Sequence, residues 1–86
     1  MHARIIGYTP EMATAIIWVK DFTPPEIHTN QIEKFLIVRG TCDIIIGEEA
    51  HRLVPGDFLS IPLYISHHVK VISMEPCVII LQRTAA

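Results

Sequence analysis

Eight short runs of β-branched and aromatic residues, separated by proline and glycine turn signals, occupy most of this 86-residue sequence. Turn signals roughly every 8–12 residues are typical of an antiparallel sandwich or barrel. No run has a convincing amphipathic helical pattern, although a short helix is a weaker alternative for the second run. We therefore predict an all-β fold. The expected strands are residues 4–8, 13–22, 35–38, 42–46, 51–54, 58–61, 67–73 and 77–82.

The length of the chain limits it to one small domain, residues 1–86. Half of its residues are hydrophobic and its mean hydropathy is +0.38, which is apolar for so short a chain. No run reaches the roughly 18–20 apolar residues of a membrane-spanning helix, so we expect no membrane partner. We expect the surplus apolar surface to form a subunit interface, and therefore a homodimer.

Charge and cysteine content exclude several classes of protein. The formal net charge is −2 and the basic residues are scattered singly, so we expect no nucleic-acid partner. The beginning of the chain lacks the apolar region of a signal peptide. Two isolated cysteines are too few for a disulfide framework, so we expect buried free thiols and a cytoplasmic protein. The scattered basic residues are Lys20, Lys34, Arg39, Arg52, Lys70 and Arg83.

The stretch from residue 25 to residue 33 concentrates groups that can bind a metal ion. It contains Glu26, His28 and Glu33 and leads directly into an apolar strand. Residues two apart on an extended chain point to the same face, so Glu26 and His28 share a face. A charged side chain that faces an interior needs a partner, because unpaired burial is costly. A metal ion and an ion-pair network are both possible partners.

The spacing of these residues resembles the first sequence motif of the cupin family. That motif runs from His-x-His through three or four residues to a glutamate, and through six more to a glycine. Glu26, His28, Glu33 and Gly40 keep this spacing, with four residues between His28 and Glu33. The one departure is Glu26, which stands where the family has its first histidine.

A second stretch resembles the other cupin motif, in which a glycine is followed by Pro-x-Gly, a histidine and an asparagine. Gly56, Pro62 and His67 keep the spacing, whereas Tyr64 replaces a glycine and Val71 replaces the asparagine. Both motifs occur in the right order and at the right separation. The chain therefore resembles a small single-domain cupin of the conserved-barrel type, with an RmlC-like jelly roll.

The resemblance implies a double-stranded β-helix, or jelly-roll barrel, with motifs at about residues 26–40 and 56–71. It places the four metal-ligand positions of the family on Glu26, His28, Glu33 and His67. A rival alignment that starts at His28 and uses Asn30 as the second ligand substitutes a poorer ligand for a good one.

The expected ligand set combines imidazole with carboxylate, which suits divalent first-row ions such as Fe, Mn, Ni and Zn. A second carboxylate in place of a histidine favours Mn(II) or Fe(II). Zinc remains an alternative, since it binds the same donor types. We expect no other cofactor.

The resemblance also implies that the barrel binds a small organic ligand or substrate beside the metal ion. An enzyme of this kind would perform dioxygenase, isomerase or cyclase chemistry. Its candidate catalytic residues are Glu26, Glu33 and Tyr64, the last because it lies three residues before His67. The alternative is a non-catalytic binding or regulatory module, with a structural metal ion or none.

Cupins often pair their N-terminal strand with the sheet of a partner subunit, which covers an edge strand. By this resemblance, residues 4–8 and 13–22 are the expected dimer contacts. His51 follows a turn rich in glutamate, and we expect it to pair there rather than to bind a metal ion.

Overall fold

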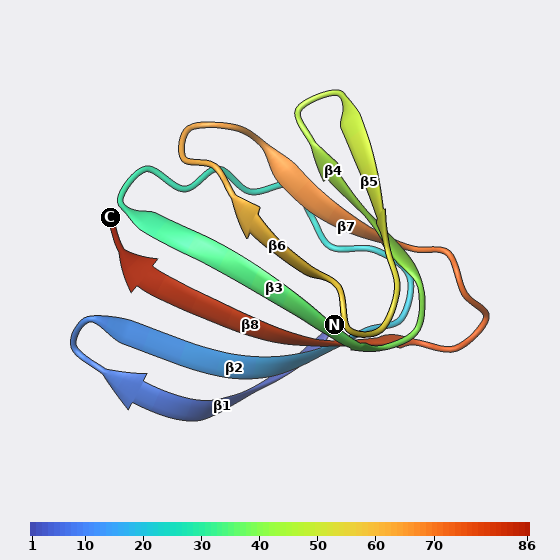
Figure 1. Cartoon of the computed structure of the whole chain (residues 1–86), viewed down its shortest axis with the longest axis horizontal. Coiled ribbons are helices and arrows are strands. Elements are labelled where there is room, and N and C mark those ends of the chain that lie inside the picture. Colours follow the sequence, from blue (N-terminus) through green and yellow to red (C-terminus); the bar gives the residue numbers. More distant parts are fainter.

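Eight antiparallel strands in two facing sheets make up the computed structural model, which describes all residues from 1 to 86 (Figure 1). Every predicted strand is present and no helix forms, so the prediction of an all-β jelly roll is confirmed. No helix of the length and hydropathy needed to cross a membrane occurs. The strands are β1 (His2–Thr9), β2 (Met12–Val19), β3 (Gln31–Arg39), β4 (Cys42–Ile46), β5 (Glu49–Leu53), β6 (Phe58–Ile61), β7 (His67–Val71) and β8 (Cys77–Ala85).

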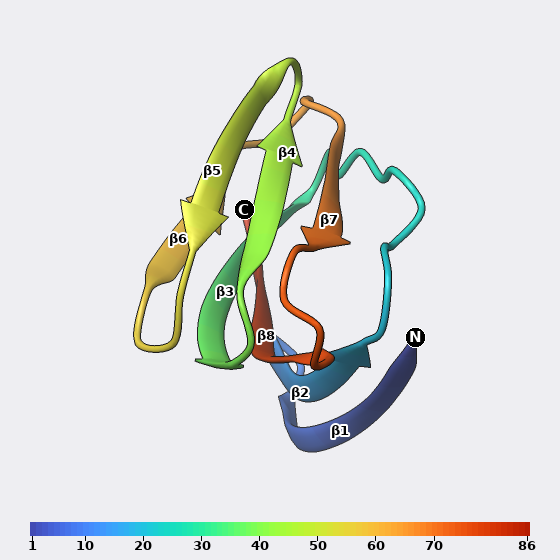
Figure 2. The same cartoon turned by 90° about the vertical axis from the view of Figure 1, so that its right-hand side faces the viewer.

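The larger sheet has the strand order β1-β2-β8-β3-β6, and the smaller sheet has the order β5-β4-β7. The chain that enters β3 extends the smaller sheet, because Phe22 pairs with Lys70 and Glu26 pairs with His67 in isolated bridges beside β7. Figure 2 shows the two layers from the side. The inner faces of the two layers enclose the core.

Several predicted strand limits differ from the structure, most clearly those of the second and third strands. The second strand was expected to reach residue 22 but ends at Val19, and the chain then bends across to pair with β7. The segment of Glu26 and His28 makes only isolated bridges, because the prolines Pro24 and Pro25 have no N–H group for a continuous ladder. The third strand begins at residue 31 rather than at residue 35.

The core follows the alternation of inward and outward residues that strands impose. On β3, for example, Glu33, Phe35 and Ile37 are buried, whereas the alternate residues Leu36 and Val38 are exposed. The buried hydrophobic residues come from both sheets. They are Ile17, Val19, Phe35, Ile37, Cys42, Ile44, Leu53, Ile61, Val69, Cys77 and Ile79.

Two turns fix how the layers meet. At Pro55-Gly56 the chain makes a tight turn, in which the Asp57 N–H donates to the Val54 carbonyl at 3.0 Å and Gly56 has φ +94°. Gly40 has φ +81°, and a Cβ there would lie 2.9 Å from the Sγ atom of Cys77. A side chain at position 40 would therefore separate the β3–β4 connection from the start of β8.

The β1–β2 hairpin extends beyond the smaller sheet. Figure 1 shows this hairpin on the opposite side of the molecule from the β4–β5 hairpin. All eight residues of β1 are exposed, and they include Ile5, Ile6 and Tyr8. The larger sheet thus continues past the region that the smaller sheet covers, and its inner face is open there.

Candidate metal centre

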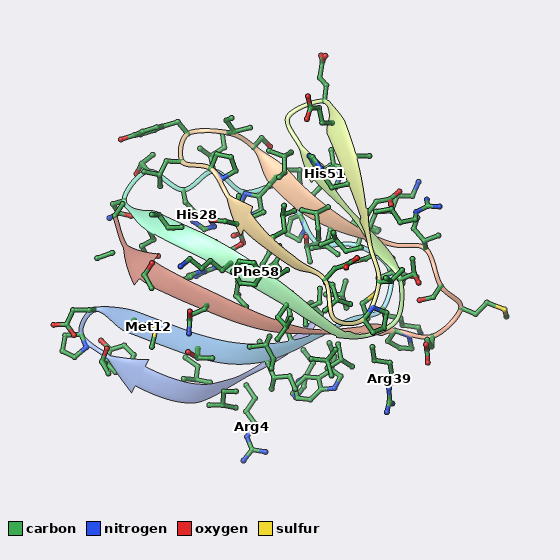
Figure 3. All side chains as sticks on the ribbon, viewed as in Figure 1. Arg4, Met12, His28, Arg39, His51 and Phe58 are labelled. Carbon is green, nitrogen blue, oxygen red and sulfur yellow. The ribbon has the colours of Figure 1, made fainter.

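Three strands and one connecting segment bring five polar side chains to one end of the interior. Glu33 lies on β3, His67 on β7 and Arg83 on β8. Glu33 and Arg83 are partners in the β3–β8 register. Glu26 and His28 arrive on the segment that runs beside β7. Figure 3 shows His28 at the end of the molecule where β3 begins.

Backbone hydrogen bonds hold the connecting segment in place. Glu26 and His67 exchange two N–H to carbonyl bonds, both of 2.9 Å. The Tyr64 N–H donates to the His28 carbonyl at 2.9 Å. Tyr64 has φ +65°, a conformation that favours glycine, and it occupies the position where the cupin motif has one. The turn geometry of that position is therefore kept despite the substitution.

The four predicted metal ligands form one cluster, in which one donor atom from each residue lies within 4.8 Å of the others. The Nε2 atom of His28 is 3.1 Å from Oε2 of Glu33 and 3.4 Å from Oε2 of Glu26. The Nε2 atom of His67 is 2.9 Å from Oε1 of Glu33. The two imidazole rings have their centroids 5.0 Å apart.

An imidazole nitrogen of the cluster is buried without a hydrogen-bond partner. The Nε2 atom of His28 is buried and makes no hydrogen bond of acceptable geometry, although two carboxylates lie close to it. A buried nitrogen without a partner is costly. A metal ion between this atom and the carboxylates would provide a partner, and the mixed imidazole and carboxylate donors suit a divalent first-row ion.

Arg83 is a member of the site that the sequence reasoning missed. Its Nε atom is 2.7 Å from Oε2 of Glu33, and its Nη2 atom is 3.5 Å from Oε2 of Glu26. It was counted among the scattered basic residues, but it belongs to the inward-facing row of β8. The alternation of that strand was a usable signal, since every second residue from position 77 faces the interior. The row is Cys77, Ile79, Leu81 and Arg83.

Glu33 is ionised in this setting. Its burial alone would raise the pKa of the carboxyl group, since desolvation disfavours the charged form. Hydrogen bonds from His67 and Arg83, with the charges of Arg83 and His28, outweigh burial and bring the pKa of Glu33 below its ordinary value of 4.5. A carboxylate that stays charged while buried is a good ligand for a cation.

A cavity of about 40 Å³ opens beside the cluster and is lined by Glu26, Glu33, His67 and Arg83 together with apolar side chains. This volume holds little more than one or two water-sized groups. Tyr64 does not line the cavity, and 70% of its surface is exposed. The structure therefore brings the backbone of Tyr64 to the site and leaves its side chain toward solvent.

The predictions for the two cysteines and for His51 can be compared directly with the structure. Cys42 and Cys77 are buried free thiols, as expected. His51 pairs with Glu49, with 3.5 Å between Nε2 and Oε2, and lies outside the cluster.

Comparison with known sequences identifies one family. A family model described as a cupin domain matches residues 14–82. That range covers most of the chain, includes all four clustered ligands and ends one residue before Arg83. No curated protein matches the chain.

Solved structures share the fold at low sequence identity. The cupin domain of Cnp3 from Schizosaccharomyces pombe has a TM-score of 0.91 and 14% identity, over 98% of this chain and 64% of that one. KdgF from a Halomonas species has a TM-score of 0.83 and 21% identity, over 95% and 76%. An RmlC-like cupin from Shewanella frigidimarina has a TM-score of 0.84 and 17% identity, over 98% and 75%. These likenesses concern the fold alone.

Proposed function

The chain belongs to the cupin family, and from this premise we propose that it binds one divalent first-row metal ion and a small organic ligand. The ligands of the ion are Glu26, His28, Glu33 and His67. Two carboxylates favour Mn(II) or Fe(II), with Zn(II) and Ni(II) as alternatives. An ion of five or six coordination sites keeps one or two of them for the organic ligand.

The observation that carries this proposal is the convergence of four donor atoms within 4.8 Å around a buried, ionised Glu33. The unpartnered Nε2 atom of His28 adds to it. Ion pairs on a protein surface do not require such convergence, whereas a metal ion does.

A bound metal ion would act as a Lewis acid or redox centre, which is the chemistry of the proposed dioxygenase, isomerase or cyclase activity. The residues of the chain would then divide the remaining roles. Glu33 is held ionised by two hydrogen bonds and serves as a fixed ligand. The side chain of Glu26 is 46% exposed, so it is the better placed of the two carboxylates to exchange a proton with a ligand. Tyr64 requires a reorientation of its exposed side chain before it can contribute.

A second function has its own support. Arg83 already supplies a positive charge to both carboxylates, and His67 satisfies the other oxygen of Glu33. A cluster neutralised in this way can persist without a metal ion. The alternative is therefore a non-catalytic ligand-binding or regulatory module, in which Arg83 takes the place of the cation.

Metal titration of wild-type protein and an Arg83→Met variant separates these two functions. If the cluster binds a metal ion, removal of the competing guanidinium tightens the binding of Mn(II) or Zn(II), and His28→Gln and Glu33→Gln weaken it at least tenfold. If Arg83 is the permanent cation, wild-type protein binds no metal ion and Arg83→Met is destabilised. Arg52→Met is the matched control, because Arg52 pairs with Asp43 on the distant β4–β5 hairpin.

We also propose a homodimer in the cytoplasm. The exposed apolar residues of the edge strand β1, which include Ile6 and Tyr8, support a subunit contact there. The two free thiols support a reducing compartment. Light scattering at micromolar concentration tests the dimer, and a monomeric mass would contradict it.

A further inference from the structure

We propose that the organic ligand is a monoanion with an apolar chain or ring, whose anionic group lies at the metal centre and whose apolar part lies in a groove on the β1–β2 hairpin. The inference rests on the proposed metal site and names the class of ligand that the site takes. We call the groove the alanine shelf. It is lined by Met1, Ala3, Ile5, Ala13, Ala15, Leu81 and Arg83.

The alanine shelf is the part of the inner face that the smaller sheet leaves uncovered. Ala13 lies opposite Arg83 across β2 and β8, and Arg83 lies opposite Glu33 across β8 and β3. Neighbouring strands are about 4.8 Å apart. Ala13 therefore lies about 10 Å from Glu33, two strands along the same row. A parallel row runs through Phe35, Leu81, Ala15 and Ile5.

The shelf adjoins the cavity at the metal centre, because Met1, Leu81 and Arg83 line both of them. A ligand that passes beside these three side chains can contact the metal centre and the shelf at the same time.

The volume and composition of the shelf indicate what fits there. Its volume is about 220 Å³, and Arg83 is its one lining residue with a charged side chain. An apolar cavity of about 150 Å³ is large enough to hold benzene. The small side chains of Ala3, Ala13 and Ala15 leave this space open. An aromatic ring or a chain of roughly six to eight carbons fits.

The charges at the inner end of the shelf indicate an anionic group. Glu26, Glu33 and Arg83 together carry one net negative charge when both imidazoles are neutral. A divalent ion changes this to one net positive charge, which a monoanion balances. The Nη1 atom of Arg83 makes no hydrogen bond within the chain, so it can donate to the same group. Metal binding thus converts the site from one that repels an anion into one that attracts it.

A second copy of the chain fits the shelf less well. Strands β1 and β2 contain no aspartate or glutamate, so the same hairpin of another copy would bring no carboxylate to Arg83 when its strands pack there. The combination of a free guanidinium donor with an apolar floor matches a small amphipathic anion.

Straight-chain carboxylates from acetate to octanoate, titrated into Zn(II)-loaded protein by calorimetry, test the inference. Burial of one CH₂ group contributes about 0.8 kcal/mol when complete. In this open groove we expect the affinity to rise about two- to fourfold per added CH₂ group, and to level off near six to eight carbons. Octanoate should also bind at least tenfold more tightly with Zn(II) than without it.

Two adjacent isoleucines of β1 provide a matched pair of variants. Ile5 is 65% exposed and lines the shelf, whereas Ile6 is 55% exposed and does not. We expect Ile5→Ser to weaken octanoate binding about three- to tenfold, and Ile6→Ser to leave it within twofold. Neither should change acetate or Zn(II) binding. Ala15→Phe, which fills the shelf, should abolish the dependence on chain length.

Each alternative outcome has a distinct meaning. If octanoate binds no more tightly than acetate while Zn(II) binds, the shelf is not a ligand site and the metal proposal stands. If Zn(II) does not bind but the affinity still rises with chain length, the metal proposal fails and the apolar site remains. If Ala15→Phe instead changes the oligomeric state and wild-type protein ignores octanoate, a second copy occupies the shelf and the inference is wrong.

Discussion

The interior of the barrel has two ends that are built on the same strands and differ in their chemistry. On β8 the inward row begins with the buried Cys77 and Ile79 and ends with Arg83. On β3 the row runs in the opposite direction, from Glu33 to the buried Ile37. One end is apolar and closed over Gly40, and the other is polar and open to solvent.

The difference shows what each kind of interior needs. The apolar end is stabilised by removal of its side chains from water, and it needs no particular partner for each residue. At the polar end every charge requires a partner, because an unpaired buried charge is costly. Glu33 is only 2% exposed and has two hydrogen-bond partners, His67 and Arg83. Substitutions at the two ends should therefore destabilise the protein for different physical reasons.

The largest loss of stability is expected at the apolar end, for Ile79→Ala. This side chain is fully buried, so its truncation loses burial and leaves a cavity, which costs about 3–4 kcal/mol. Ile80→Ala is the matched control on the outer face of the same strand, where about 1 kcal/mol is expected. Urea denaturation of the two variants measures the difference. Equal losses would mean that the outer face of the larger sheet is covered as completely as the core.

The apolar end was predictable from sequence because one physical rule governs it. β-Branched runs and turn residues were enough to locate all eight strands, and alternation fixes which residues face inward. The strand limits were less predictable. The bend after Val19 and the bridges at Phe22 and Glu26 depend on pairing with β7, which is far away in the sequence.

The second effect is expected at the polar end, for Glu33→Gln in metal-free protein. The amide is isosteric but uncharged, so Arg83 and His67 lose a charged partner, and we expect a loss of about 2–3 kcal/mol at pH 7. The pKa of Glu33 is lowered in the folded state, so its stabilising contribution is present above the ordinary value of 4.5. That contribution is lost as the pH falls through the folded value, and the two proteins should converge in stability there.

Glu49→Gln is the control for this experiment. Glu49 pairs with His51 on the surface, and its side chain is 82% exposed. Exposed pairs of this kind contribute little to stability. If Glu33→Gln changed stability no more than Glu49→Gln, the charge of Glu33 would have no role in the fold and the polar end would be sustained by packing alone.

The polar end was only partly predictable from sequence. The spacing of the two motifs was enough to select Glu26, His28, Glu33 and His67, and the structure brings these four together. Arg83 was missed, because its place in the site depends on its register partner Glu33 on β3. The exposure of the Tyr64 side chain was not predictable either, since spacing specifies the turn but not the direction in which the hydroxyl points.

The smallest loss of stability concerns the thiol of Cys42 at the apolar end and appears at alkaline pH. Burial, with further contributions from Cys77 and Asp43, raises the pKa of Cys42 from its ordinary value of 9.0 to about 12. The unfolded chain therefore loses this proton at lower pH than the folded chain does. The contribution of the neutral thiol to the free energy of unfolding is therefore fully present below pH 9 and is lost as the pH rises toward 12. About 1.4 kcal/mol of it is lost by pH 10.

Denaturation at pH 8 and pH 10 measures this decline, with Cys42→Ala as the comparison. Tyrosine and lysine titrate in both proteins, so the difference between their slopes isolates the thiol. Wild-type protein should lose about 1.4 kcal/mol more than Cys42→Ala over this interval, because only wild-type protein must keep the Cys42 thiol protonated. The same slope in both would mean that water reaches Cys42. With the expected result, the two ends of the interior limit stability at opposite extremes of pH, Glu33 in acid and Cys42 in base.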